Sequence, residues 1–475
     1  MNSYTFSTIH NPNKVFILHK SKIEKRLDPF YYIPELVELE NKVLEKIPKR
    51  LRDYVISISS GETPNTSESE LYYTDKENGV PFIRVQNLSP TGILNLEDCK
   101  YITFETHNGK LKRSQVFEDD LLVKITGVGR MAVASIPPKG FEGNINQHIC
   151  VIKTESREAS ETIAAFLNSD IGEKISSRRT TGGTRPALDY PALLSIPVIK
   201  DKRILDITKK VVEQKTKNDS QAEKLLAGID DYLLGELGIT IPEVPENTLK
   251  SRIFTSSIKE ITNKRLDPFF HQSKFSLNIE SIKNSKYQVK QLNDIIQGNL
   301  IKGTLPSQEE KEGNNFVVQI NCINADGTIS FDDILTAKDI FTKYQKLIKG
   351  DVLIVITGAT IGKIAQWNYE GDYFLGGDIV KFQTNSNADS SFVYHFLRSK
   401  PIQIEIKRNI TGATNGHLAP DDINHFPIPI PPLEKQKEIA DHITAIRQKA
   451  SDLKNQTKEV LKKASKEIEQ IILGT

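Results

Sequence analysis

The sequence predicts an α+β fold with two tandem, similar domains of mixed helices and strands, each followed by a long helix. Three observations predict it. A set of motifs occurs twice in the same order, short segments alternate apolar and polar residues as strands do, and two long segments without internal proline are rich in Lys, Glu, Ala, Leu and Ile. The 475 residues are 38% hydrophobic, which suffices for two or three domains with cores of their own.

The repeat begins with a nearly identical octapeptide. KRLDPFYY starts at Lys25 and KRLDPFFH starts at Lys264, an offset of 264 − 25 = 239 residues. Three further pairs of segments follow in the same order: 81–93 with 315–329, 119–134 with 350–365, and 180–199 with 410–430. The first of these pairs predicts an alternating strand followed by a Gly turn in each half. Four collinear matches indicate a duplication.

Both later pairs of segments contain a Thr-Gly dipeptide at a matching position. These dipeptides are Thr126-Gly127 with Thr357-Gly358, at an offset of 357 − 126 = 231, and Thr181-Gly182 with Thr411-Gly412, at an offset of 411 − 181 = 230. Glycine is the usual residue where the backbone needs a positive φ. We therefore favour a shared turn at the Thr-Gly itself, which needs no ligand.

Residues 201–237 and 431–473 predict two long helices. In the second, apolar or small residues recur at an alternating spacing of four and three over about four heptads, which is typical of a coiled-coil seam. Pro431 and Pro432 suit a helix start, and Gly238 ends the first helix. We expect the helices to pair as an antiparallel coiled coil through Ile207, Val211, Leu225 and Ile229 of the first helix and Ile439, Ile443, Ile446, Leu453 and Val460 of the second.

Charge and cysteine content limit the function classes. The 63 Lys+Arg nearly balance the 61 Asp+Glu, so any contact with a nucleic acid must come from local basic patches. Cys99, Cys150 and Cys322 have no paired spacing and leave one thiol over from any single disulfide, which fits a reducing, cytoplasmic setting. The first residues, MNSYTFSTIHNPNK, lack an apolar signal region, and no stretch approaches the roughly 18 apolar residues of a membrane span. We expect a soluble, unexported protein.

Enzyme motifs fit poorly. The segment GATIGK (358–363) has three residues between its glycines and an Ile after the lysine, whereas a phosphate loop needs four residues and then Ser or Thr. No NPPY-like segment and no glycine-rich cofactor loop occurs, and the nine histidines have no zinc-site spacing. We expect no catalytic residues, no metal and no cofactor, although scattered carboxylates of a nuclease would escape a motif search.

Five segments in order carry a family resemblance: RLDPFYY, ISSGETP (58–64), GVPFIRVQNL, NQHICVI (146–152) and PIPIPPLEKQKEIA (427–440). The chain resembles the specificity subunit of a type I restriction-modification system. The resemblance implies two target-recognition domains, each of which reads one half of a bipartite asymmetric site in double-stranded DNA. It also implies spacer helices that dock two adenine methyltransferase subunits, with restriction/translocase subunits joining them. SIPVIKDKRILDI (195–207) departs from the family pattern at the first helix.

The resemblance implies a role for each of the four predicted parts of the chain. Residues 14–199 and 250–430 would be the target-recognition domains, and residues 200–240 and 431–475 the conserved spacer helices. At about 1.5 Å per residue, such helices span roughly 50 to 65 Å, which matches about 15 to 19 base pairs of DNA.

Two loops are the main candidates for DNA contact. SSRRTTGGTR (176–185) is basic without an acid and carries Arg178, Arg179, Thr184 and Arg185. Its counterpart KRNITGATNGH (407–417) carries Lys407, Arg408, Thr414, Asn415 and His417. Such residues offer phosphate contacts, and the Asn415 amide is able to pair bidentately with adenine.

Weaker candidates lie on the predicted strands and turns. Arg84, Gln86 and Gln319 alternate with apolar neighbours, where a solvated sheet face is the slightly favoured alternative. Lys124, Arg130 and Lys363 flank the turns, where a basic side chain suits a phosphate but is also common on plain surfaces. His148 is equally suited to a partly buried structural role.

The alternative function is a protein-interaction scaffold with a dimerising coiled coil. That class of protein would lack the salt-dependent affinity for DNA that phosphate contacts produce.

Overall fold

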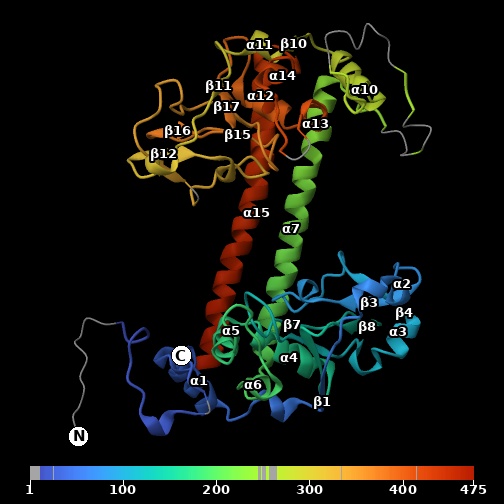
Figure 1. The fold of residues 1–475 in the computed structure, drawn as a ribbon, viewed down its shortest axis with the longest axis vertical. Coiled ribbons are helices and arrows are strands. Elements are labelled where there is room, and N and C mark those ends of the chain that lie inside the picture. Colours follow the sequence, from blue (N-terminus) through green and yellow to red (C-terminus); the bar gives the residue numbers. More distant parts are fainter. Residues whose placement is uncertain are drawn as a thin grey trace. The chain divides into compact units, whose positions relative to one another are not determined.

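The computed structural model describes residues 11–24, 26–243, 248, 253–255, 265–332, 334–412 and 415–474. Lys25, Lys264 and Thr414, which the sequence analysis singles out, lie outside these residues. The chain divides into two compact units. Unit 1 comprises Met1–Asp219 and Lys454–Thr475, and unit 2 comprises Ser220–Leu453, so each unit contains part of both long helices. Figure 1 shows the elements of both units coloured along the sequence.

Unit 1 holds two sheets with helices packed beside them. The four-stranded antiparallel sheet has the order β1-β9-β6-β7, and the five-stranded sheet has the order β2-β4-β3-β8-β5 with β3 and β8 parallel. The strands are β1 (Ser57–Ser60), β2 (Tyr73–Thr74), β3 (Gly79–Ile83), β4 (Lys100–Thr103), β5 (Gln115–Phe117), β6 (Leu121–Lys124), β7 (Ala134–Ser135), β8 (Glu142–Ile145) and β9 (Ile149–Lys153). The helices are α1 (Pro34–Lys46), α2 (Ser69–Tyr72), α3 (Phe104–Asn108), α4 (Arg157–Leu167), α5 (Asp170–Arg178) and α6 (Tyr190–Leu194).

Unit 2 repeats much of this order. Its four-stranded sheet runs β11-β17-β14-β15, a three-stranded sheet runs β13-β12-β16 with β12 and β16 parallel, and β10 pairs with β18. The strands are β10 (Val289–Gln291), β11 (Ile301–Lys302), β12 (Asn315–Val318), β13 (Leu335–Ala337), β14 (Val352–Val355), β15 (Ile364–Gln366), β16 (Tyr373–Leu375), β17 (Ile379–Phe382) and β18 (Pro427–Pro429). The helices are α10 (Ser273–Lys283), α11 (Leu292–Ile295), α12 (Ser390–Leu397), α13 (Lys400–Asn409) and α14 (Pro420–Asn424).

Short 3-10 turns connect these elements. In unit 1 they are η1 (Lys20–Lys22), η2 (Pro29–Tyr32), η3 (Leu51–Tyr54), η4 (Thr66–Glu68), η5 (Val85–Asn87) and η6 (Lys112–Ser114). In unit 2 they are η7 (Gln308–Glu310) and η8 (Ile320–Cys322). Both η5 and η8 follow the strand that pairs in parallel, β3 in unit 1 and β12 in unit 2, so the same turn ends the same strand twice.

The central strands β6 and β14 are buried on both faces, which explains their unbroken apolar sequence. On one face of β6, Leu121 and Val123 pack into the core with α4 and α5. On one face of β14, Val352 and Ile354 pack into the core with α12 and α13. The alternate residues face the second sheet of each unit. Each unit therefore has a sheet with helices on one face and a second sheet on the other.

The two predicted long helices are confirmed as α7 (Lys202–Leu237) and α15 (Leu433–Leu473). In unit 2, the Glu236 carboxylate pairs with the Lys435 ammonium at 2.7 Å, and the Tyr232 and His442 rings lie 4.2 Å apart. The end of α7 thus meets the start of α15 there, so these segments run antiparallel.

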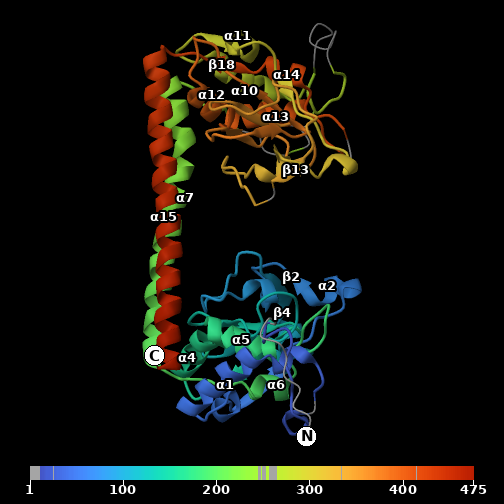
Figure 2. The ribbon, with the colours of Figure 1, turned by 90° about the vertical axis from the view of Figure 1, so that its left-hand side faces the viewer.

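In unit 1, the other ends of α7 and α15 also lie side by side (Figures 1 and 2). The Asn218 amide donates to the Thr457 hydroxyl at 3.1 Å between the helices, and Ile204 shares a core with Ile468 and Ile472. Of the predicted pairing residues, Ile229, Ile439 and Ile443 are buried, whereas Ile207, Val211, Leu225, Ile446, Leu453 and Val460 are half-buried.

Candidate nucleic-acid interface

The repeated RLDPF motif caps a helix in each unit. The Arg26 guanidinium donates to the carbonyls of Arg179 at 2.7 Å and Thr180 at 2.6 Å, which follow the last turn of α5. Asp28 accepts from Arg26 at 2.8 Å and from the Tyr31 amide at 3.2 Å. A helix end leaves carbonyls without intrahelical partners, and the guanidinium supplies donors for them.

Unit 2 uses the same device. Arg265 donates to the carbonyls of Asn409 at 3.1 Å and Ile410 at 3.3 Å beyond α13, and it pairs with Asp267 at 2.7 Å. The most similar segment of the two halves is therefore a structural clamp in both units.

Arg178 and Arg179 lie inside unit 1, and this corrects the expectation of an exposed basic patch. Their exposed fractions are 6% and 3%, and both guanidiniums pair with the carboxylate of Glu40 on α1, which is 5% exposed. Arg178 also donates to the Tyr31 carbonyl at 2.6 Å and lies 4.1 Å from the centre of the Tyr31 ring. These contacts leave neither guanidinium free to meet a phosphate.

Arg408 occupies the matching position in unit 2 and also turns inward. Its guanidinium lies 4.1 Å from the centre of the Phe270 ring, donates to the Phe270 carbonyl at 3.0 Å, and pairs with Glu405 at 3.5 Å. We therefore assign Arg408 the same structural role.

The two buried carboxylates, Glu40 in unit 1 and Glu405 in unit 2, have pKa values that are shifted in opposite directions. Burial raises the pKa of Glu40, but the hydrogen bond from Arg179 and the charges of Arg179, Arg178 and Arg50 outweigh burial and hold that pKa below its usual value. Burial likewise raises the pKa of Glu405, and the hydrogen bond from Asn278 and the charge of Arg408 leave it above its usual value.

The basic residues beside the turns brace those turns. The Lys124 ammonium donates to the carbonyls of Val128 at 2.7 Å and Arg130 at 3.1 Å, and burial lowers the pKa of Lys124. In unit 2, the Lys363 ammonium donates to the Ile323 carbonyl at 3.0 Å.

Arg130 is committed in a similar way. It donates to the Ser169 carbonyl at 2.7 Å and to the Asn168 carbonyl, and it pairs with Asp170 at 3.4 Å. The structure thus gives Lys124, Arg130 and Lys363 partners within their own units, which favours a structural role for them over contact with a phosphate.

Residues 181–187 form a loop, here called loop 1, that closes on itself. The Thr181 amide donates to the Ala187 carbonyl at 2.9 Å, and the Ala187 amide donates to the Thr181 carbonyl at 2.8 Å. The amide of Gly127 donates to the Pro186 carbonyl at 3.0 Å, so the two Thr-Gly turns of unit 1 meet here. Thr184 and Arg185 are exposed on this loop.

The corresponding loop of unit 2, here called loop 2, comprises the described residues among 411–417. The Thr411 amide donates to the His417 carbonyl at 2.8 Å, and the His417 amide donates to the Thr411 carbonyl at 2.7 Å. The Gly358 amide donates to the Gly416 carbonyl at 3.1 Å. Asn415 is exposed and His417 is half-buried, with its Nδ1 3.2 Å from the Thr357 hydroxyl.

The remaining candidates lie around these loops or at strand ends. Lys407 is exposed in the last turn of α13. Arg84 and Gln319 are the N-cap residues of η5 and η8 and are half-buried, and Arg84 donates to the Asp98 carbonyl at 3.0 Å. Gln86, within η5, is exposed.

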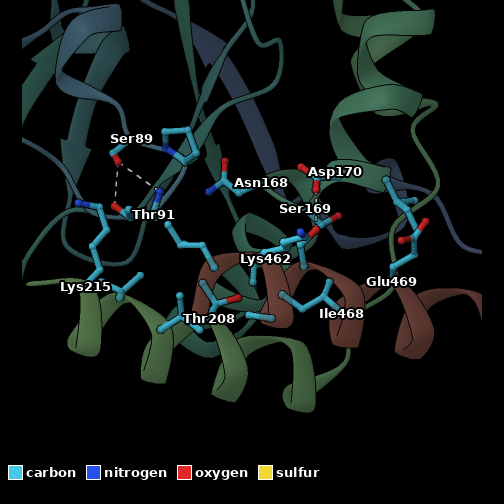
Figure 3. Close-up of a pocket in the computed structure, with 18 of the residues that line it drawn as sticks. Ser89, Thr91, Asn168, Ser169, Asp170, Thr208, Lys215, Lys462, Ile468 and Glu469 are labelled. Atoms are coloured by element: carbon cyan, nitrogen blue, oxygen red, sulfur yellow. Dashed lines mark hydrogen bonds between the residues drawn. The ribbon is translucent and has the colours of Figure 1, made fainter. Parts of the chain in front are cut away.

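A pocket of about 570 Å³ opens in unit 1 between α5, α7 and α15. Figure 3 shows Thr208 and Lys215 of α7 and Lys462, Ile468 and Glu469 of α15 along one side, with Ser89, Thr91 and Asn168 across from them. In the part of the chain that the structure describes, no group of three His, Cys, Asp or Glu side chains is placed to hold a metal ion. No described helix has the length and apolar character that a bilayer crossing requires.

The fold and loops define a class of protein: an α+β chain with two similar units, each of which presents a polar loop from the same place in its topology. Residues 284–463 match the family of the type I restriction modification DNA specificity domain. The comparisons thus relate this chain to type I restriction-modification specificity subunits over part of its length.

Individual relatives are distant. The chain is 26% identical over 193 residues to a protein described as the specificity subunit of the type I restriction enzyme MjaX of Methanocaldococcus jannaschii, and the match covers 38% of this chain and 44% of that protein. The chain therefore spans less than half the length of the curated relative that it matches.

Among solved structures, the S subunit of a type I restriction-modification system from M. genitalium has a TM-score of 0.44 and 14% identity, covering 90% of this chain and 94% of that chain. A structure concerning assembly and conformational transition of the type I R-M system has a TM-score of 0.45 and 17% identity, covering 90% and 95%.

Proposed function

We propose that this chain is the sequence-specific DNA-recognition subunit of a type I restriction-modification complex and that it performs no catalysis itself. The observation that carries the proposal is the DNA specificity domain match over residues 284–463, within the half whose motifs and strand order recur in the other half. A duplicated recognition module suits a DNA site with two separated parts. Each unit then reads one half of a bipartite asymmetric site.

The proposed division of labour follows the repeat. Residues 14–199 and 250–430 are the two target-recognition domains, and residues 200–240 and 431–475 are the conserved spacer helices. The 36 residues of α7 and the 41 of α15 pair as an antiparallel coiled coil and set the spacing of the half-sites. Their lengths correspond to about 54 and 62 Å at about 1.5 Å per residue.

The proposed partners are double-stranded DNA, two methyltransferase subunits that dock on the helices, and restriction/translocase subunits. An internal duplication gives one chain two equivalent docking positions for two identical methyltransferases. The associated subunits, and not this chain, supply adenine methylation and ATP-dependent cleavage.

We carry forward as DNA contacts the polar residues that are exposed, together with the half-buried Gln319 and His417. They are Gln86, Thr184 and Arg185 in unit 1 and Gln319, Lys407, Asn415 and His417 in unit 2, together with Thr414 from the sequence pattern. Arg178, Arg179 and Arg408 support the loops from within, and Arg84, Lys124, Arg130 and Lys363 support neighbouring turns.

Co-expression with the methyltransferase encoded beside it tests the proposal. Host DNA is sequenced for modified adenines, with the methyltransferase alone as the control. A single bipartite motif with a fixed spacer, which changes on one side when one half of the chain is exchanged, is the expected result. A stable complex that produces no modified motif, and a chain that has no salt-dependent affinity for duplex DNA, would instead favour the scaffold function.

A further inference from the structure

Loop 1 and the described residues of loop 2 share two backbone features. Gly182 and Gly412 have φ of 88° and 92°, a region that favours glycine. A Cβ added at Gly182 would meet the Arg185 carbonyl at 3.0 Å, and one added at Gly412 would meet the Asn415 carbonyl at 2.3 Å. Both loops are closed by reciprocal amide-to-carbonyl bonds across six residues, between Thr181 and Ala187 in loop 1 and between Thr411 and His417 in loop 2. Arg185 and Asn415 therefore occupy the same position, at an offset of 415 − 185 = 230.

The side chains at this shared position differ in hydrogen-bonding chemistry. Arg185 and Asn415 are both exposed. A guanidinium offers two parallel donors, which match the O6 and N7 acceptors of guanine in the major groove. A carboxamide offers one donor and one acceptor, which match the N7 acceptor and N6 donor of adenine.

A neighbouring histidine orients the arginine. His148 directly precedes β9, and its Nε2 atom lies 2.8 Å from the Arg185 Nη2 atom. A guanidinium can only donate, so the Nε2 atom accepts in this contact. Burial, and secondly the charge of Arg185, lower the pKa of His148, which favours this acceptor form. One edge of the guanidinium is held in this way, and its remaining N–H groups are left for a ligand.

We propose that this shared loop position determines one base in each half-site: Arg185 selects a guanine in the half-site read by unit 1, and Asn415 selects an adenine in the half-site read by unit 2. The inference rests on the proposed function and adds to it the residues and bases concerned.

The test uses the full chain co-expressed with its methyltransferase, and the fraction of modified adenine is measured at every genomic site that differs from the motif by one base. The variant Arg185→Asn should relax or change one G·C position in the half-site of unit 1 and leave the half-site of unit 2 unchanged. Loss of a bidentate pair should reduce the preference for that base by roughly 5- to 150-fold. Asn415→Arg should act in the same way on one A·T position of the other half-site.

Two further variants separate base reading from other roles. Arg185→Lys keeps the charge without the fork of donors and should also lose the guanine preference. Arg52→Asn removes another exposed arginine of unit 1, whose side chain is 64% exposed, and should leave the motif unchanged. In each variant the unaltered half-site reports that the complex is assembled.

Two outcomes would overturn the inference while the proposed function stands. One is an unchanged motif in Arg185→Asn and Asn415→Arg. The other is a uniform decrease at all sites with Arg185→Lys resembling the wild type, which would make Arg185 a phosphate contact. If the wild-type chain yields no bipartite motif, the proposed function itself fails, and the inference fails with it.

Discussion

Glu40 should be among the costliest single residues to replace in unit 1. Its carboxylate pairs with Arg178 and Arg179 and lies 3.4 Å from the Arg50 guanidinium. Glu40→Gln keeps the volume of the side chain and removes its charge, so two guanidiniums that are 6% and 3% exposed lose their counter-charge. Removing one partner of a buried ion pair typically costs about 3 to 5 kcal/mol, and we expect a loss of unit 1 stability in that range.

The effect has a definite pH dependence. The folded-state pKa of Glu40 lies below its usual value, so its stabilisation is present above the unfolded-state pKa and is lost as pH falls through the folded-state pKa. The stability difference between wild type and Glu40→Gln should therefore be largest near neutral pH and shrink in acid.

Glu405→Gln is the matched control in unit 2. The folded-state pKa of Glu405 is raised, so its contribution favours folding at low pH and is lost as pH rises through the folded-state pKa. Glutamine resembles the protonated carboxyl, and its oxygen still accepts from Asn278, which donates to Glu405 at 2.8 Å. This variant should be neutral or slightly stabilising at pH 7.

Urea unfolding with two probes separates the units. The one tryptophan of the sequence, Trp367, is fully buried in unit 2, whereas far-UV circular dichroism follows both units. Glu40→Gln should lower the midpoint of the unit 1 phase in circular dichroism by about 1 to 2 M urea and leave the Trp367 fluorescence transition in place. A loss under about 1 kcal/mol, the value of an exposed pair, or an equal shift in both signals would refute the buried-clamp argument.

Three further predictions follow from buried or partly buried polar groups. Lys381 pairs with Asp351 at 2.7 Å, and their side chains are 5% and 1% exposed. Lys381→Met should lower the free energy of unfolding by about 3 to 5 kcal/mol, measured in the Trp367 fluorescence transition, and adding Asp351→Asn should recover much of this loss. Asn218→Ala removes the buried hydrogen bond to Thr457 and should cost about 1 to 3 kcal/mol in the unit 1 phase of circular dichroism. Burial raises the pKa of Cys99 to about 11. Its alkylation by iodoacetamide at pH 7, followed by mass spectrometry, should therefore be roughly 100-fold slower than that of an ordinary cysteine. Rapid labelling would show that the thiol is exposed.

The helices and the order of elements were within reach of the sequence because their signals are local. A run without proline and a seam of spacing four and three are contained in one stretch of chain, and α15 begins at Leu433, directly after Pro431 and Pro432. Strands β3 and β12 followed from the alternating segments at 81–93 and 315–329. The sheet partners, by contrast, depend on pairings between distant segments.

The structural role of Arg178 and Arg179 could not be predicted from the neighbouring sequence alone. Residues 176–185 contain three arginines and no acid, and the acid that neutralises two of them, Glu40, lies 178 − 40 = 138 residues earlier on another helix. The segment was therefore predicted to be exposed, because the acid that pairs with its arginines is close to them only in the folded chain. One signal in the sequence pointed the other way: Arg178 and Arg408 match between the halves, and so do Tyr31 and Phe270, the aromatic rings that they cover.

A comparison of matching positions in the two halves thus separates residues with a structural role from residues that are candidates for DNA contact. Side chains that recur at matching positions, such as Arg26 with Arg265, bind carbonyls inside their own unit, because both units must solve the same folding problem. Side chains that differ at a matching position, such as Arg185 with Asn415, lie exposed on a loop whose backbone is held the same way in both units. If the two units read different half-sites, divergence is required only at the second kind of position. This is why the base preference is expected to follow a single exposed residue on each loop, and the clamp beneath it should tolerate no exchange.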